Sequence, residues 1–331
     1  MHRKNKVDKT IPVSKLKVGM YVLMPVAWTD HPFLKSQFRL TSQDQIRKII
    51  VAGFTEVQVD LSKSQVVDAD PETIETIPED LKKSIVPEGL REAIFDKTLP
   101  PLTKAEKVHQ HSGEMIKNLL NNPTAENIRA TRRAVADVVD LILDDLETSH
   151  HLTMITNHDY YTYTHSVHVG ILSICLARNI FQRSNAHDLH ELGAGFFLHD
   201  LGKVRIDQEI INKPGKLTDD EMREMKKHPN LGFKILHETK QMTEESKIIV
   251  LQHHERYDGT GYPQGIRGDD MHVYGKICSI ADVYDALTTD RPYRQRLQPF
   301  EGLKIMKEQM MHHFQKDLFE QFVLMLAGKK N

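Results

Sequence analysis

Two adjacent histidines precede a glycine-rich stretch that ends in proline, in the segment HHERYDGTGYP of residues 253–263. Imidazole nitrogens are common ligands of transition metals. Side chains of neighbouring helical residues point about 100° apart, so His253 and His254 are better placed to reach two neighbouring ions than to share one. Glycine lets a backbone approach a ligand closely. The segment therefore predicts a two-metal site beside a loop that contacts substrate.

Other histidines and aspartates in the C-terminal half are candidate ligands for the same ions. The full set is His165, His199, Asp200, His228, His253, His254 and Asp282. A single helical histidine is more often a core or surface residue, but His199 and Asp200 directly follow the apolar residues 196–198. A carboxylate buried there needs a cation or several donors. Seven side chains exceed the six positions of an octahedral ion, so we expect two ions bridged by Asp200.

The ligand types indicate the chemistry of such a pair. A hydroxide held between two divalent ions is a nucleophile near neutral pH, and the ions also neutralise phosphoryl oxygens. Imidazole and carboxylate ligands without thiolate suit iron, manganese or zinc and do not discriminate strongly among them. Cys175 and Cys278 both lie in apolar helical segments. We expect them to be buried thiols and not ligands.

Composition narrows the classes of partner. At 331 residues the chain is long enough for two domains. Its net charge of −2 predicts no nonspecific binding to polymeric nucleic acid, so metals or a few basic side chains must hold any anionic substrate. No run approaches the roughly 18 apolar residues of a membrane span, and no apolar region follows the charged first ten residues. We expect a cytoplasmic protein that does not enter the membrane.

The sequence patterns around these residues predict an α+β protein in three parts. These parts are a small β-rich module at 1–64, an acidic linker with a helical hairpin at 65–150, and an all-α domain at 151–331. Alternating and turn-bounded patterns predict one or two strands within 11–26, with a turn at Gly19, and another strand at 55–61. A short helix is expected between them, at 43–51.

Helical spacing of apolar residues accounts for nearly all of the remaining chain. The linker is expected at 66–80 and the hairpin helices at 103–120 and 124–146. Later helices are expected at 163–181, 186–201, 218–229, 243–254, 274–289 and 299–326. Thr218 and Glu221 have the capping-box form, and Pro229 interrupts or ends the helix that they start. The hairpin is also a candidate dimerisation surface.

Five segments carry a resemblance to a known family. They are His165, HDLGK at 199–203, KKHP around His228, QHHERYDGTGYP at 252–263 and ADVYDALTTDRPYR at 281–294. In this order they closely resemble the HD-GYP branch of the HD-domain metal-dependent phosphohydrolases, over about residues 155–325. The β-rich module resembles an uncharacterised module often found ahead of such domains. The resemblance implies a helical bundle, iron or manganese ions, and a 3′,5′-cyclic dinucleotide substrate, cyclic di-GMP or cyclic GMP-AMP.

The resemblance also implies roles for single residues. The seven candidate ligands fall on the family's ligand positions. Lys203 matches a lysine that reaches the scissile phosphate, although a lysine at a helix C-terminus can also simply interact with the helix dipole. Arg291 and Arg294 match positions that hold phosphate oxygens, a task that suits guanidinium groups. Tyr262 is a candidate contact for a base or phosphate, or the loop around it supports the adjacent metal ligands.

Two further positions refine the prediction. Asp285 lies three residues after Asp282 and so on a similar helix face; we expect it to orient a ligand or an arginine, or to form a simple salt bridge. Some family members carry a glutamate one turn before the first histidine that helps to hold a third metal, and this chain has Tyr161 there. We therefore expect two metals and, as first product, the linear 5′-phosphorylated dinucleotide.

The leading prediction is a cyclic-dinucleotide phosphodiesterase. In it Asp200 and Lys203 are catalytic, while Lys203, Tyr262, Arg291 and Arg294 bind the substrate. One alternative is a receptor that binds the dinucleotide without turnover and signals through the N-terminal module or a partner protein; such receptors typically lose metal ligands, and none is lost here. The other is a nucleotide phosphomonoesterase, against which the GYP loop argues.

Overall fold

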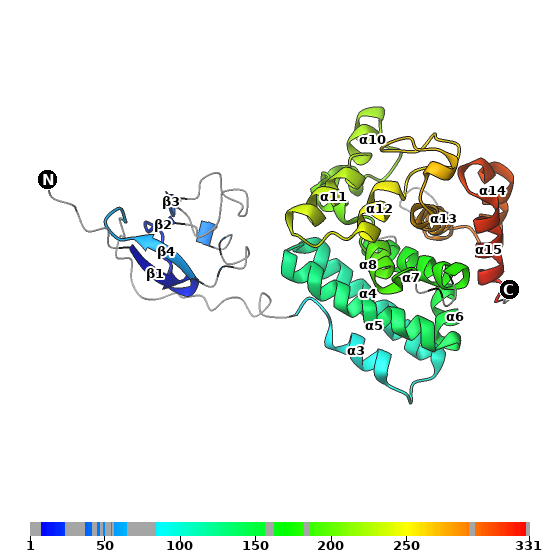
Figure 1. Ribbon diagram of the computed structural model, residues 1–331, viewed down its shortest axis with the longest axis horizontal. Coiled ribbons are helices and arrows are strands. Elements are labelled where there is room, and N and C mark those ends of the chain that lie inside the picture. The colour runs from blue at the N-terminus through cyan, green and yellow to red at the C-terminus, as the bar shows by residue number, and fades with distance from the viewer. Residues whose placement is uncertain are drawn as a thin grey trace. The chain divides into compact units, whose positions relative to one another are not determined.

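The computed structural model describes residues 8–23, 37–41, 45–46, 49, 54, 56–64, 84–155, 162–181, 184, 186–290 and 295–328. The chain divides into two compact units, Met1–Lys83 and Ser84–Asn331. Figure 1 shows the strands in the first and the helical bundle in the second. The predicted linker at 66–80 lies outside the described residues. Residues 84–150 pack in the same unit as the later helices. The predicted boundary at residue 150, between the helical hairpin and the all-α domain, does not separate compact units and stays a prediction.

The first unit contains a four-stranded antiparallel sheet, which confirms the predicted α+β class. Its strands are β1 (Asp8–Pro12), β2 (Tyr21–Leu23), β3 (Gln37–Arg39) and β4 (Glu56–Asp60), in the order β1-β4-β2-β3. Alternation in β4 buries Val57 and Val59 while Glu56 and Gln58 face solvent, as the two-residue period of a strand requires. The described part of the predicted helix at 43–51 adds Ile46 and Ile49 to the same small core.

The described residues of the second unit form a helical bundle. In chain order its helices, with η for 3-10 helices, are α3 (Glu88–Phe95), α4 (Pro101–Asn121), α5 (Ala125–Asp144), α6 (Leu146–Met154), α7 (Thr162–Phe181), α8 (Leu189–Phe197), η3 (Leu201–Arg205), α9 (Gln208–Ile211), α10 (Asp219–Met225), α11 (His228–Glu238), α12 (Glu244–Gln252), η4 (Gly268–Asp270), α13 (Val273–Thr288), α14 (Pro299–Gln309), η5 (Met311–His313) and α15 (Lys316–Leu326). The sequence did not predict α3, α6, α9 or α11. The single helix expected at 299–326 is two helices, because η5 separates α14 from α15.

Helix α7 lies at the centre of the bundle and packs against α4, α8 and α13 (Figure 1). Every residue from His165 to Ala177 is buried, as expected for a helix that is apolar on all sides. The packing is close: a Cβ atom added at Gly170 would lie 2.4 Å from the Phe197 ring. Because His165 belongs to this helix, core packing around the helix fixes the position of its backbone.

Helix ends place the other candidate ligands. The predicted capping box of Thr218 and Glu221 is present and starts α10. Pro229 lies in the first turn of α11, where its missing N–H costs nothing, and His228 is therefore the first residue of α11. Helix α12 ends at Gln252, so His253 is its C-cap and His254 follows in a turn. The helical geometry assumed for this doublet was thus wrong for His254.

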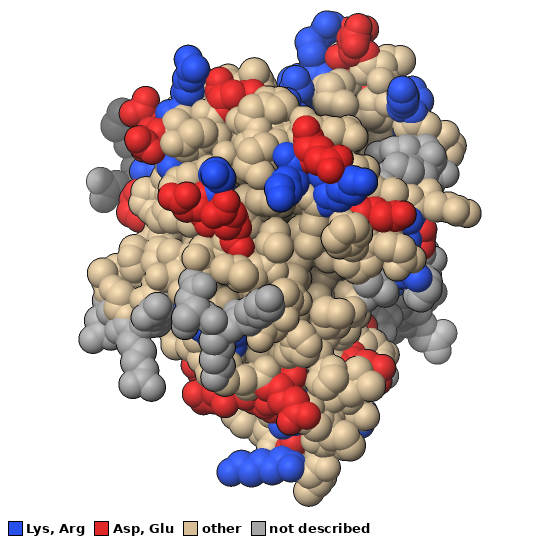
Figure 2. Space-filling model, turned by 90° about the vertical axis from the view of Figure 1, so that its right-hand side faces the viewer, with Lys and Arg blue, Asp and Glu red and all other residues tan. Residues whose placement is uncertain are grey.

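The surface carries no large area of a single charge sign on the face that Figure 2 shows. There, Lys and Arg side chains are interspersed with those of Asp and Glu. None of the described helices combines the length and the apolar composition that a bilayer span needs.

Candidate metal centre

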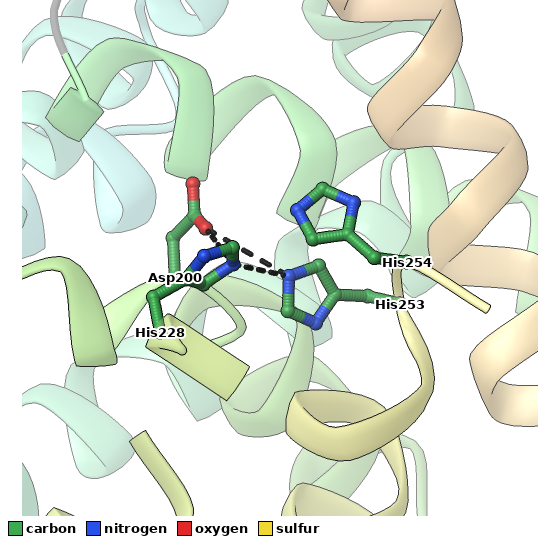
Figure 3. A group of neighbouring side chains, drawn as sticks. All are labelled: Asp200, His228, His253 and His254. Carbon is green, nitrogen blue, oxygen red and sulfur yellow. Dashed lines mark hydrogen bonds and ion pairs between the residues drawn. The ribbon is translucent and has the colours of Figure 1, made fainter. Parts of the chain in front are cut away.

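All seven predicted ligands come together in the second unit. They form two adjoining groups, within each of which one ligand atom per residue lies within 4.8 Å of the others. The groups are Asp200, His228, His253 and His254, and His165, His199 and Asp282. Figure 3 shows the first group converging from the turn after α8, the start of α11 and the end of α12. Gly202 allows η3 to approach α11, since an added Cβ would lie 1.9 Å from the His228 carbonyl oxygen.

Backbone carbonyls fix the orientation of three of the imidazoles. The Nδ1 atoms of His199, His228 and His253 donate to the carbonyl oxygens three residues earlier, at 2.8, 2.8 and 2.9 Å. A carbonyl oxygen only accepts, so the proton resides on Nδ1 and the Nε2 lone pair is left for a ligand role.

Two of these lone pairs face each other. The Nε2 atoms of His228 and His253 are 3.1 Å apart. Burial lowers the pKa of His228 to about 4 and that of His253 well below its usual value, so both rings are neutral at pH 7. Two buried lone pairs at this distance repel each other unless a cation lies beside them. This arrangement fits a metal site.

Asp200 lies between the two groups and is almost completely buried. Its Oδ1 atom is 3.2 Å from His228 Nε2, and its Oδ2 atom is 3.5 Å from the Nε2 atoms of both His165 and His199. Burial alone would raise its pKa, but Lys203 and the neighbouring histidines outweigh burial and hold the pKa well below the usual value. The carboxylate is therefore ionised, with one oxygen towards each group, which is the position that a bridging ligand requires.

Orphaned atoms provide a second test of fit. Among the described residues, His199 Nε2 and Asp200 Oδ1 are buried and form no hydrogen bond. Such groups are costly unless something satisfies them. Neutral imidazoles and a carboxylate are the donor set that iron, manganese and zinc accept. The residues present thus fit divalent ions, and the donor types do not select among these three.

Asp285 orients His165 from behind. It accepts hydrogen bonds from His165 Nδ1 at 2.6 Å, from His168 Nδ1 at 2.5 Å and from Thr289 Oγ1 at 2.9 Å. Burial would raise the pKa of Asp285, but these hydrogen bonds outweigh it and keep the pKa below the usual value. The Nε2 atom of His165 then faces Asp282 Oδ1 at 3.1 Å. Asp285 orients a candidate ligand, as one of the predicted alternatives required.

Changing Asp285 to asparagine is expected to weaken metal binding by about 10- to 100-fold, the usual effect of losing a partner that orients a metal-bound histidine. The amide offers one acceptor where the carboxylate offers two, so it cannot hold both His165 and His168. Chelator competition on the full chain measures the affinity. Asp140→Asn is the matched control, because it only breaks an exposed pair with His190. An unchanged affinity in Asp285→Asn would contradict this role.

Lys203 and Tyr262 both border the ligands. Lys203 Nζ is 2.5 Å from Asp200 Oδ2. The Tyr262 ring packs against the His254 ring, tilted by 33° with 4.7 Å between centroids, and its backbone N–H donates to the His254 carbonyl oxygen at 3.1 Å. Burial raises the pKa of the Tyr262 hydroxyl above its usual value, so it stays protonated. The GYP loop supports His254, which is one of the two predicted alternatives.

Glu255 was not singled out by the sequence analysis, although it follows the histidine doublet directly. It is fully buried, and its Oε1 atom accepts from the backbone N–H groups of Gln264 and Gly265 at 2.7 and 3.1 Å. This carboxylate fastens the far end of the GYP loop to the segment that carries the ligands. Only the fold reveals the contact, because an isolated glutamate gives no such signal.

A cavity of about 1100 Å³ opens onto the ligands. His165, His228, His254, Asp282, Lys203 and Tyr262 contribute to one part of its lining. Helix α4 contributes Lys117, Leu120 and Asn121, which the sequence analysis treated only as part of a hairpin. Amphipathic spacing in α4 indicated the buried face but not what the other face would line. Arg291 and Arg294, and Tyr161 with its bearing on a third metal, lie outside the described residues.

Comparison with known proteins decides the family. A family model described as HD domain matches residues 146–318. A cyclic di-GMP phosphodiesterase of Pseudomonas aeruginosa is 31% identical over 326 residues, which cover 95% of this chain and 76% of that protein. The chain belongs to the HD domain family. Its five motif segments place this HD domain in the HD-GYP branch.

Other relatives match the HD domain more locally. A cyclic di-GMP phosphodiesterase response regulator of Xanthomonas campestris, RpfG, is 46% identical over 99 residues, or 30% of this chain and 26% of that protein. A 3′3′-cGAMP-specific phosphodiesterase of Vibrio cholerae is 42% identical over 127 residues, or 37% of this chain and 24% of that protein. In both cases the matched residues make up only part of the relative.

Two findings concern the rest of the chain. A family model described as a domain of unknown function, DUF3391, matches residues 8–134, so the module that the sequence analysis expected ahead of the HD domain is present. The solved structure of an HDGYP protein from Bdellovibrio bacteriovorus aligns with a TM-score of 0.63 at 19% identity, over 97% of this chain and 100% of that one. The two proteins share a fold.

Proposed function

We propose that this chain is a metal-dependent phosphodiesterase that hydrolyses a 3′,5′-cyclic dinucleotide to the linear 5′-phosphorylated dinucleotide. The observation that carries the proposal is the pair of ligand groups with Asp200 between them, on the wall of a cavity large enough for a nucleotide. The names of the relatives include cyclic di-GMP and 3′3′-cGAMP. Both are candidate substrates, because metal ligands read phosphate and not base edges.

We assign two divalent ions to the two groups, with iron or manganese as the leading candidates and zinc compatible with the same donors. When bound, such ions supply Lewis acidity to the phosphoryl oxygens and lower the pKa of water. Hydrolysis forms a bond from water oxygen to phosphorus and breaks the bond from phosphorus to the 3′ oxygen, which takes up a proton. Lys203 is placed to donate to the negative charge that develops there.

The remaining predicted contacts belong to the same proposal. Tyr262 borders the cavity and packs against His254, from where its protonated hydroxyl can donate a hydrogen bond to substrate. Arg291 and Arg294 are proposed to hold phosphate oxygens, on the basis of their motif positions. The chain is nearly neutral overall, so in this proposal the metal ions and the basic side chains at the site bind the doubly charged ligand.

The deciding experiment compares turnover of cyclic di-GMP, cyclic GMP-AMP and cyclic di-AMP by protein reconstituted anaerobically with iron or aerobically with manganese. The linear dinucleotide is expected to appear first. Tight binding without turnover would favour the receptor. Release of phosphate from nucleoside monophosphates, with no ring opening, would favour the phosphomonoesterase. Three ions per active chain with mononucleotide as the initial product would overturn the two-metal assignment.

The α4 side of the cavity leads to a separate expectation for Lys117. A cyclic dinucleotide carries two phosphodiester charges and only one can lie at the ions, so the other lies elsewhere in the cavity. Besides Lys203, the lysines that line the cavity are Lys117, Lys213 and Lys216. Lys213 is paired with Glu221 at 2.6 Å, whereas Lys117, on α4, lies 5.7 Å from the centre of the Tyr163 ring. Lys117→Ala is expected to raise KM about 3- to 10-fold, as for a solvated charge contact of roughly 1 kcal/mol.

Two controls sharpen the Lys117 measurement. Bis(p-nitrophenyl) phosphate has a single phosphodiester, so its hydrolysis should be unaffected by Lys117→Ala. Lys307→Ala removes an exposed lysine of α14 outside the cavity lining and should leave both substrates unchanged. Equal losses on the small and the cyclic substrate would contradict a contact with the second phosphate.

A further inference from the structure

A third group of metal-type ligands lies outside the site described above. Asp258, within the GYP loop segment, faces His312 and His313 of η5, and one ligand atom from each lies within 4.8 Å of the others. Asp258 Oδ2 is 3.9 Å from His312 Nε2. The two segments are joined by a backbone hydrogen bond from Tyr257 N–H to the His313 carbonyl oxygen at 2.9 Å. Backbone pairing thus brings the three side chains together.

The hydrogen bonds and burial of the three side chains leave candidate ligand atoms near one another. Asp258 Oδ1 accepts from the backbone N–H and the hydroxyl of Thr260 at 3.0 and 2.7 Å, which leaves Oδ2 towards His312. Burial would raise the pKa of Asp258, but its hydrogen bonds outweigh burial and keep the group ionised. Burial, Arg256 and His312 lower the pKa of His313, so its ring is neutral at pH 7. The two imidazole rings are 4.3 Å apart between centroids.

We propose that Asp258, His312 and His313 form a peripheral zinc site that fastens the GYP loop to the connection between α14 and α15. Two imidazoles and a carboxylate suit zinc, with water at the fourth position. Ligand atoms around a tetrahedral zinc are about 3.3 Å apart, so the group must contract slightly. His312 can rotate to do so, because its side chain is 60% exposed.

The site joins two segments that differ in their relation to the catalytic centre. The GYP loop carries Tyr262, which packs against His254, whereas η5 contributes nothing to the cavity lining. A zinc ion would restrain the loop through Asp258 and stabilise the arrangement described here by mass action. The nearby charge of Arg256 weakens the affinity for a cation, so this ion should exchange more readily than those at the buried centre.

The proposal also changes how ion counts are interpreted. A chain that holds two catalytic ions and one at this site contains three, without any third catalytic ion. Counting ions in a variant that lacks His312 and His313 separates the two cases. The peripheral site does not depend on the proposed phosphodiesterase activity, since none of its residues belongs to the two ligand groups.

The test compares zinc content per chain in the full-length protein and in the variant His312→Gln/His313→Gln. Both are stripped with chelator, dialysed against the same micromolar zinc and desalted before metal analysis. Zinc at the buried centre is common to both and cancels. The double variant is expected to hold one zinc ion fewer, and His190→Gln, which removes an exposed surface histidine, none fewer. Equal zinc content in the wild type and the double variant would overturn the site.

A second measurement addresses the loop itself. Zinc should slow hydrogen exchange in residues 256–268 more in the wild type than in the double variant, where only zinc at the buried centre remains. If the double variant does not fold by circular dichroism, His312→Gln alone decides, because the exposed position tolerates the change. Unchanged zinc content in that single variant, or equal protection of the loop by zinc in the wild type and the double variant, would contradict the proposal.

Discussion

Asp200→Ala is expected to lose both the bound ions and all hydrolysis of cyclic dinucleotides. The Asp200 carboxylate faces histidines of both groups, with Oδ1 towards His228 and Oδ2 towards His165 and His199. Asp282 also reaches both groups, but it has only one histidine neighbour in each, His165 and His254. Without it, each group keeps only part of its donors and the shared ligand is gone. Metal analysis of the reconstituted protein and a turnover assay measure the two losses together.

The variant Asp200→Asn tests the charge of the carboxylate separately from the size of the side chain. The amide fills the same volume but supplies one weak oxygen donor and no negative charge, so we expect it to lose the ions as Asp200→Ala does. Asp140→Asn, at an exposed pair, should keep both ions and full activity. Circular dichroism of each variant separates metal loss from unfolding. An Asp200→Ala protein that retains two ions and normal turnover would show that the carboxylate does not bridge.

Lys203→Ala is expected to keep the ions and slow turnover by about 10²-fold or more, the range for a lost electrostatic or acid contribution. Lys203 Nζ contacts Asp200 Oδ2 at 2.5 Å, the oxygen that one ion requires. An ion held by this oxygen would compete with Lys203, whose side chain also lines the cavity. Removing this competing cation should leave metal affinity equal or higher. Measurement of kcat at saturating metal checks the slower turnover, and chelator competition checks the metal affinity.

A second substrate distinguishes the two roles of Lys203. The nitrophenolate of bis(p-nitrophenyl) phosphate leaves without a proton, so a lysine that only protonates the leaving oxygen matters little for it. A lysine that stabilises phosphoryl charge matters for both substrates. Lys203→Arg preserves the charge and should recover part of the rate only in the second case. Normal kcat in Lys203→Ala on both substrates would refute any catalytic role.

The sequence by itself determined several of the helices and the identity of the candidate ligands. Apolar spacing predicted α4, α5 and α7 to within a few residues, because that pattern follows directly from the face that each helix buries. The Thr218 capping box is equally local, since four consecutive residues contain the whole interaction. The histidine and aspartate motifs are distinctive enough to indicate two metals before any coordinates are known.

Tertiary structure decided how these parts are held and what surrounds them. Asp285 became the partner of His165 and His168, Glu255 the anchor of the GYP loop, and Lys117 part of the cavity. His312 and His313, which lie beside Asp258, belong to none of the motifs. Each of these contacts joins segments that are far apart in the sequence. Which side chains meet depends on where every intervening helix begins and ends. A local pattern encodes the face that a helix buries, but not which distant side chain it meets there.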